Sequence, residues 1–179
     1  MLSAIGNMVA DAAEYMEQEL DGGAEPRQGA PDAKECRWGI LAAGRICHDF
    51  VLALKALPGE ASVVAVGARS LESANTFADK FGIPNRHGSY AELVNDPQVD
   101  IIYVGSLHHL HVEHSLMALR AGKHVLCEKP MALNAADAAL VLEEARKHDR
   151  FFLHGVWSRF LPSCDGGPLH LAARRSGLG

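Results

Sequence analysis

Basic side chains are scarce in this sequence relative to acidic ones. Its 179 residues include 17 Lys and Arg against 22 Asp and Glu, which gives a formal net charge of −5. A protein that binds a phosphate backbone needs a basic surface, so we expect no nucleic acid as a main partner. No apolar run approaches the roughly 20 residues that span a bilayer, so we expect no membrane partner either.

Targeting signals and paired cysteines are also missing from the sequence. The N-terminus has no basic segment followed by an apolar one, and acidic residues occur early, so we expect neither a signal peptide nor a transit peptide. The four cysteines are Cys36, Cys47, Cys127 and Cys164, and no two of them form a C-x-x-C pair. A disulfide scaffold uses cysteine more densely, so a reduced, cytoplasmic protein is expected.

The composition is that of an ordinary globular protein, with 48% hydrophobic and 22% charged residues. Such values exclude wholesale disorder, and the length suggests a single domain. The patterns divide the chain into three parts. Residues 1–34 combine an amphipathic helix with a Gly/Pro-rich linker, residues 35–157 form the domain, and residues 158–179 are a tail without clear periodicity.

Short apolar runs alternate with helical patterns through the middle part. The expected strands cover residues 38–42, 62–68, 100–105, 124–127 and 151–156, and the expected helices cover 46–57, 71–81, 109–121 and 135–148. Ser89 and Glu92 form a capping box that opens a further short helix. Strands separated by helices of this length predict an α/β fold, a doubly wound parallel sheet of the Rossmann type.

Three loops of this fold are expected to meet at the carboxyl edge of the sheet, where such proteins bind ligands. They are residues 42–47, 105–111 and 128–130. A dinucleotide-binding turn usually reads G-x-G-x-x-G, whereas this sequence reads Ala42-Ala43-Gly44-Arg45-Ile46-Cys47. The middle glycine, which lets the backbone approach a pyrophosphate, is retained, and the flanking residues are small. Many domains that bind no nucleotide have a similar turn.

The end of the second expected strand favours NADP over NAD. An NAD site usually places Asp or Glu there to bind the ribose hydroxyls. This sequence has Arg69 followed by Ser70. A guanidinium can pair with the 2′-phosphate and a serine hydroxyl can donate to it. The alternative is that Arg69 is a solvated surface residue.

A lysine follows the fourth expected strand in the run Glu128-Lys129-Pro130. The proline restricts the backbone around Lys129, so we expect this side chain to be kept out of bulk water. In such a position it could exchange protons with a substrate. The alternative is a structural Glu–Lys pair at the end of a strand.

The nine residues from Gly122 to Pro130, Gly-Lys-His-Val-Leu-Cys-Glu-Lys-Pro, resemble the hallmark segment of the Gfo/Idh/MocA oxidoreductases. The resemblance is closest to the dimeric dihydrodiol dehydrogenase branch, which oxidises trans-dihydrodiols of arenes and D-xylose with NADP. It covers roughly residues 36–162. The other segments that carry it are Arg37–Ile40, Gly67–Arg69, Gly88–Leu93, Tyr103–Gly105 and Val156–Phe160.

The resemblance implies a role for individual residues. Lys129 takes part in proton transfer at the reacting hydroxyl, Glu128 helps to position it, and Arg69 with Ser70 meets the adenosine phosphate. The remaining implied cofactor contacts lie in the first turn, in the loop beside the pyrophosphate and nicotinamide, and in the segment leading toward the substrate: Ala42, Gly44, Arg45, Ile46, Ser106, Leu107, His108, His111, Trp157 and Arg159.

The sequence departs from that branch in two ways. His154 stands where the branch usually has Glu. The family also continues with a second α/β domain, built on a mostly antiparallel sheet, which supplies a catalytic Tyr or His, most substrate contacts and the homodimer face. We expect this second domain to be missing, as in a truncated or alternatively spliced product.

Two other chemistries have weaker support. His108, His109, His111 and His114 cluster near the start of one expected helix, but no carboxylate or Cys completes a tetrahedral set at a familiar spacing, so no metal is expected. Cys127 lies near Lys129 and could act as a nucleophile, although a strand cysteine is more often a small buried residue.

Two functional hypotheses follow. In the first, the protein is an NADP-dependent oxidoreductase that moves a hydride between the nicotinamide and a carbinol carbon of a trans-dihydrodiol or of an aldopentose such as D-xylose. In the second, the chain is a catalytically inactive remnant of the cofactor domain that binds NADP or a protein partner.

Overall fold

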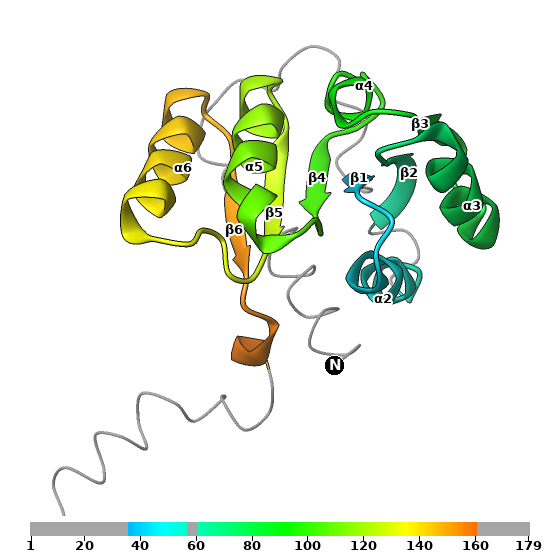
Figure 1. Cartoon of the computed structure of the whole chain (residues 1–179), viewed down its shortest axis with the longest axis horizontal. Helices are drawn as coiled ribbons and strands as arrows, with labels where there is room; N and C mark the ends of the chain where they lie inside the picture. Colours follow the sequence, from blue (N-terminus) through cyan, green and yellow to red (C-terminus); the bar gives the residue numbers. More distant parts are fainter. Residues whose placement is uncertain (1–35, 57–60, 161–179) are drawn as a thin grey trace, which may run out of the picture.

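The computed structural model describes residues 36–56 and 61–160. The helix and linker predicted over residues 1–34, and most of the tail predicted over 158–179, lie outside these ranges. The described residues form a sheet with helices on both faces (Figure 1).

All strands of the sheet run parallel, in the order β3-β2-β1-β4-β5-β6. This is the doubly wound Rossmann order, so the predicted fold is confirmed. The strands are β1 (Cys36–Leu41), β2 (Ala61–Gly67), β3 (Asn85–His87), β4 (Ile101–Val104), β5 (His124–Glu128) and β6 (Phe152–Gly155).

Two apolar clusters hold the helices on the two faces of the sheet. The first contains Phe50 and Phe77 from one pair of helices, together with Trp38 of β1. The second contains Leu93 and Leu119 from the opposite helices. The helices are α2 (Arg45–Leu54), α3 (Leu71–Phe81), α4 (Tyr90–Val94), α5 (His111–Arg120) and α6 (Ala135–Lys147), with 3-10 turns η1 (His108–Leu110) and η2 (Trp157–Phe160).

The helix caps explain why several boundaries were predictable. Ser89 Oγ accepts the backbone N–H of Glu92 at 3.2 Å, and Asn134 Oδ1 accepts that of Asp137 at 2.9 Å. The return bond of the capping box differs from the standard pattern, because the Glu92 carboxylate accepts the N–H of Gly88 instead of Ser89. Gly82 ends α3 in the left-handed region, with φ of 69°.

The predicted elements differ from the observed ones in a few places. The expected helix over 46–57 ends at Leu54, and the expected helix over 109–121 begins with the separate turn η1. Strand β3 was not predicted, because its three residues are polar and it pairs only with β2 at the sheet edge. Strand β5 continues through Glu128, so this carboxylate belongs to the sheet.

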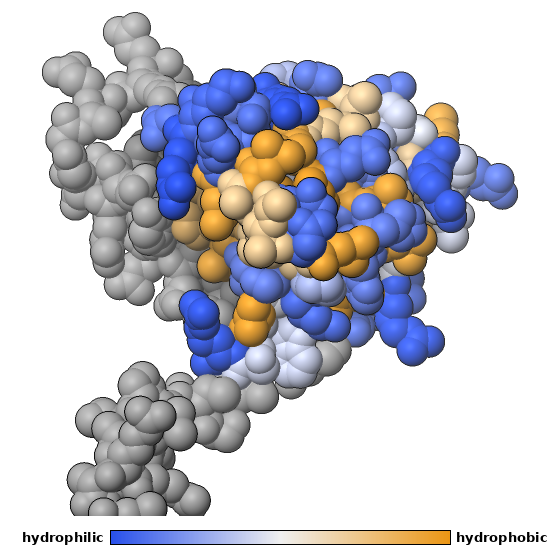
Figure 2. Space-filling view, turned by 60° about the vertical axis from the view of Figure 1, so that its left-hand side comes forward, coloured by the Kyte–Doolittle hydropathy of each residue, from blue (hydrophilic) through white to orange (hydrophobic). Residues whose placement is uncertain are grey.

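Apolar residues reach the surface on the side of the molecule that carries α6 (Figure 2). The exposed large side chains of this part include Leu133, Leu140 and Leu142. Within residues 36–56 and 61–160, no helix combines the length and apolarity that a membrane crossing requires.

The packing of α5 against α6 includes a buried acid. The Glu144 carboxylate accepts hydrogen bonds from Arg120 Nε at 3.0 Å and from His148 Nε2 at 3.0 Å, and Lys147 lies 3.4 Å away. The hydrogen bond from Arg120 is the main cause that lowers the pKa of Glu144 from 4.5 to about 2.

We therefore expect Glu144→Gln to make the protein less stable at neutral pH. A lowered carboxyl pKa stabilises the fold above the unfolded value, and this stabilisation is lost as the pH falls from 4.5 to about 2. In urea unfolding curves, the difference in free energy of unfolding between wild type and Glu144→Gln should shrink over that pH range. Glu143→Gln, at the exposed neighbouring position, is the control and should follow the wild type throughout.

Candidate active site

The carboxyl ends of β1, β4 and β5 lie side by side at one edge of the sheet. The strand registers pair Leu41 with Val104 and Val104 with Cys127, so the three following loops start at the same level. The N–H of Gly105 also donates to the carbonyl of Leu41 at 3.2 Å. Strand order reverses between β1 and β4, and open parallel sheets bind their ligands at such a crevice.

The turn after β1 has the backbone of a phosphate-binding turn. Ala42 lies in the left-handed region with φ of 93°, where the usual motif has its first glycine. Gly44 is the N-cap of α2, and no side chain caps this helix. The first N–H groups of α2 are therefore available to an anion, which the helix dipole also favours. These features fit a dinucleotide pyrophosphate.

Close packing of α2 against the sheet uses a glycine that directly follows another strand, β4. The usual motif has its third glycine where this chain has Cys47, which is fully buried. Cys47 Sγ lies 3.6 Å from the carbonyl of Gly105. A Cβ on Gly105 would overlap Cys47 Sγ and would lie 2.8 Å from Tyr103 Cε1. The missing glycine of the turn is thus compensated at the end of β4.

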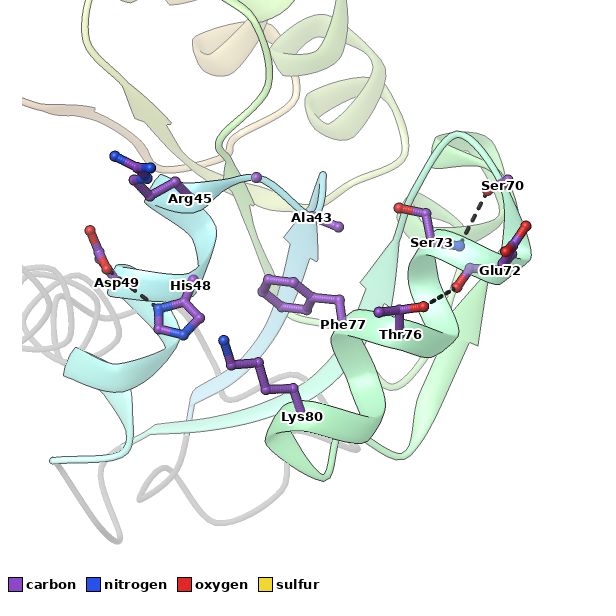
Figure 3. A pocket seen from close by; sticks show the side chains of 11 residues that line it. Ala43, Arg45, His48, Asp49, Ser70, Glu72, Ser73, Thr76, Phe77 and Lys80 are labelled. Carbon is purple, nitrogen blue, oxygen red and sulfur yellow. Dashed lines mark hydrogen bonds and ion pairs between the residues drawn. The ribbon is translucent and has the colours of Figure 1, made fainter.

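A pocket of about 740 Å³ lies between α2 and α3 (Figure 3). It joins the turn after β1 to the end of β2, because Gly44, Arg45 and Ser70 all line it. Ser70 caps α3, its Oγ accepting the N–H of Ser73 at 3.2 Å. The other lining residues were not predicted, although many recur at helical spacing: Ala43, His48, Asp49, Glu72, Ser73, Thr76, Phe77 and Lys80.

Arg69 is exposed beside this pocket and does not line it. Its charge reaches Tyr90, where it partly offsets the rise in pKa that burial gives the phenol. No carboxylate occupies positions 68–70. Glu72, in the first turn of α3, is the nearest acid in sequence.

The Glu128 carboxylate is 5% exposed and has two hydrogen-bond donors. Tyr103 Oη donates to its Oε1 at 2.8 Å, and the backbone N–H of Lys129 donates to its Oε2 at 3.1 Å. Burial, followed by the charge of Glu128, raises the pKa of the Tyr103 phenol, so this group remains a donor. Tyr103 is therefore a structural partner of the candidate site that sequence reasoning did not identify.

Lys129 itself is exposed, so the expectation that this side chain is kept out of bulk water is wrong for the described residues. The physical reason is its place just beyond the sheet edge, where the chain leaves the last buried position, Glu128. The backbone of Lys129 is fixed, and the peptide bond to Pro130 is cis. Lys129 does not line the pocket between α2 and α3.

The remaining predicted residues divide into surface and interior positions. Leu107 is 63% exposed, and His108 and Arg159 are exposed too. Ser106 and Trp157 are half-buried, with the Ser106 hydroxyl 2.8 Å from His114 Nδ1. His111 is fully buried, and its ring nitrogens lie against the carbonyl oxygens of Ser106 and Pro130. Its imidazole therefore contacts the backbone of the loops that follow β4 and β5.

The described residues give little support to a metal site or to a cysteine nucleophile. In residues 36–56 and 61–160, no group of three or more His, Cys, Asp or Glu side chains is arranged to hold a metal ion. Cys127 is fully buried, and this burial raises the pKa of its thiol to about 12. A thiol in that state is a weak nucleophile.

Comparison with known proteins identifies the family. Residues 36–156 match the Gfo/Idh/MocA family, described as an oxidoreductase family with an NAD-binding Rossmann fold. This chain belongs to that family. The match covers β1 to β6, including the turn after β1 and the Glu128–Pro130 segment.

The chain is similar to trans-1,2-dihydrobenzene-1,2-diol dehydrogenases of vertebrates. It is 48% identical to that of Danio rerio over 128 residues, which are 71% of this chain and 38% of the relative. The Xenopus laevis protein is 50% identical over 127 residues, 70% of this chain and 38% of the relative. The chain thus spans less than two fifths of the length of these relatives.

Solved structures show the same fold. An NAD-binding oxidoreductase from Klebsiella pneumoniae superposes with a TM-score of 0.71 at 28% identity, covering 78% of this chain and 39% of that one. A 3-ketoreductase from Actinomadura kijaniata, in complex with NADP and TDP-benzene, gives a TM-score of 0.64 at 32% identity, covering 68% and 37%.

The positive φ of Ala42 leads to a stability prediction. A left-handed backbone is costly for alanine, whereas glycine adopts it freely. We expect Ala42→Gly to raise the free energy of unfolding by about 0.5–1 kcal/mol, the strain relieved exceeding the added chain entropy. Ala43→Gly is the matched control, because Ala43 does not have a positive φ, and it should lower stability. Equal changes in the free energy of unfolding for the two variants, measured in urea, would contradict the interpretation that the Ala42 backbone is strained.

Proposed function

We propose that the protein is an NADP-dependent oxidoreductase. The reaction transfers a hydride between the nicotinamide and a carbinol carbon of a trans-dihydrodiol or of an aldopentose such as D-xylose. The observation that carries the proposal is the common edge on which the turn at Gly44 and the Glu128–Lys129 segment lie. Family membership and the dihydrodiol dehydrogenase relatives support the same reaction.

The first part of the mechanism is cofactor binding by the turn after β1. The uncapped N–H groups at the start of α2 bind the pyrophosphate, and the side chains of Arg45 and Ile46 flank it. Arg69 pairs with the 2′-phosphate, and Ser70 adds a hydroxyl donor at the start of α3. The absence of a carboxylate at positions 68–70 removes the repulsion that NAD-specific sites use against that phosphate.

The second part is proton transfer at the reacting hydroxyl. Bound NADP supplies the hydride acceptor at C4 of its nicotinamide. The amine of Lys129 would accept the proton of the reacting hydroxyl. Glu128 holds the backbone of this lysine through the 3.1 Å bond to its N–H, and Tyr103 fixes the carboxylate from the interior. The protein thereby orients the acid–base group relative to the sheet edge.

The exposed and half-buried predicted residues after β4 and β6 complete the proposed cofactor cleft. Ser106, Leu107 and His108 follow β4, beside the crevice at which strand order reverses. Trp157 and Arg159 lie in η2, directly after β6. We propose that these two groups contact the nicotinamide half of the cofactor and the entrance to the substrate site.

A second candidate function is NADP binding without catalysis. The exposure of Lys129 favours it, because proton transfer from a lysine is more effective where water is excluded. The two functions are distinguished by turnover assays of the 179-residue chain with D-xylose and with a trans-dihydrodiol.

The role of Arg69 predicts a selective loss of NADPH affinity. Hydrogen bonds to a charged group contribute about 1.5–3 kcal/mol, so Arg69→Ala should weaken NADPH binding about tenfold to a hundredfold. Binding of NADH, which has no 2′-phosphate, should change by less than about twofold. The measurement is titration by nicotinamide fluorescence, with Arg146→Ala on α6 as the control. Equal losses for both cofactors would show that Arg69 does not bind the phosphate.

The role of Lys129 predicts a loss of turnover with little loss of binding. General acid–base groups contribute about 10²–10⁴-fold, so Lys129→Met should lower kcat by at least about 100-fold. The Kd for NADPH should stay within about threefold, because the backbone contacts to the pyrophosphate remain. Lys147→Met on α6 serves as the control. Normal turnover of the Lys129 variant would refute its role, and NADPH binding without turnover in the wild type would favour the second function.

A further inference from the structure

The segment that carries Lys129 is held by two histidines from different elements. His111, in the first turn of α5, places Nδ1 2.7 Å from the carbonyl oxygen of Pro130. His154, in β6, places Nε2 3.2 Å from the backbone nitrogen of Met131. The residues directly after Lys129 are therefore bound through one carbonyl and one N–H.

The two histidines have opposite hydrogen-bonding roles. The second ring nitrogen of His111, Nε2, lies 3.0 Å from the carbonyl oxygen of Ser106. A carbonyl oxygen only accepts, so the shorter contact, from Nδ1 to Pro130, requires the ring N–H of His111 on Nδ1. His154 must accept from the N–H of Met131, which requires that its Nε2 carries no proton.

We propose that His111 and His154 form a clamp that positions Lys129, in which Nδ1 of His111 donates to the Pro130 carbonyl and neutral His154 accepts from the Met131 N–H, and that protonation of His154 opens it. The positioning of Lys129 for catalysis rests on the proposed function. The clamp itself is a property of the chain without ligand. An imidazolium at His154 would face the Met131 N–H with a second donor, so this bond would be lost.

The groups around the His154 ring favour its neutral state. Burial lowers the pKa of His154 below 6.5, and the charges of Arg159 in η2 and His111 in α5 lower it further. His111 faces the ring of His108 in η1 and lies near His114 in α5. Burial likewise lowers the pKa of His114, so that neighbour stays neutral as well.

The pH dependence has a defined sign. A histidine whose pKa is lowered by folding favours the folded state in its neutral form. The contribution of His154 is complete above its ordinary value of 6.5 and is lost as the pH falls through the lower folded value. We expect the clamp to be closed at neutral pH and to open in mild acid.

The first test measures the histidine ring states in the full chain by NMR, without ligand. At pH 7.5 the ¹⁵N shifts should show a proton on Nδ1 of His111, and His154 neutral with its proton on Nδ1. An imidazolium at His154, or a proton on its Nε2 at this pH, would overturn the proposal. A His111 ring without a proton on Nδ1 would overturn its role as donor to Pro130.

The second test measures hydrogen exchange of the Met131 amide, expressed as protection relative to the unstructured rate. His154→Leu removes the acceptor, and loss of one hydrogen bond should lower protection about fivefold to tenfold. His154→Gln retains an acceptor oxygen and should keep protection within about twofold of the wild type. His148→Leu, at the C-cap of α6, is the control and should leave Met131 protection unchanged.

The pH series separates positioning from simple loss of structure. Wild-type Met131 protection should fall as His154 titrates, whereas protection in His154→Gln should not follow that titration. Unchanged protection in His154→Leu, or identical pH profiles for wild type and His154→Gln, would overturn the clamp. If His154→Leu does not fold, the comparison of wild type with His154→Gln across the pH series still tests the clamp.

The connection to catalysis is tested separately. His154→Leu should lower kcat about tenfold or more while the Kd for NADPH stays within about twofold, and His154→Gln should restore kcat. If His154→Leu opens the clamp and leaves kcat unchanged, the positioning role is refuted but the clamp is not. A clamp confirmed by exchange, together with normal turnover of Lys129→Met, would refute the proposed role of Lys129 and leave the clamp intact.

Discussion

The pairing of β1 with β4 is the constraint on which the candidate site depends. The chain builds β1, β2 and β3 outward in one direction and then returns across β1 to place β4 on its other side. Because helices connect parallel strands, this reversal sends α2 and α5 to opposite faces and opens a crevice between two strand ends. The turn at Gly44 and the loop from Gly105 border that crevice, and β5 adds Glu128 one strand further along.

The sequence was sufficient to predict the fold because its local signals agree with one another. The capping box at Ser89 marks a helix start that the structure confirms, and Ser70 and Asn134 cap α3 and α6 in the same way. The apolar runs that became β4 and β5 are fully or almost fully buried, as strands covered on both faces should be. Strand β3 was missed because a three-residue polar strand at an edge has no such pattern.

Prediction of the candidate site was less complete, because spacing identifies residues but not their surroundings. The Glu128–Pro130 run was found from the sequence, yet the burial of Glu128 and the exposure of Lys129 depend on where the sheet ends. The bond from Tyr103 to Glu128 joins residues 25 positions apart, and no local pattern announces it. The same holds for Met131 and His154, which meet only because β5 and β6 are neighbours.

The packing at Gly105 has a consequence for how nucleotide-binding turns are sought in sequences. Two chain segments that touch need room between them, and either one can provide it by lacking a side chain. Here the helix has a sulfur atom at the point of contact, and the glycine directly after the opposite strand has only a hydrogen. A search that counts glycines within a single turn overlooks such an exchange, whereas one that considers both contacting segments together would find it.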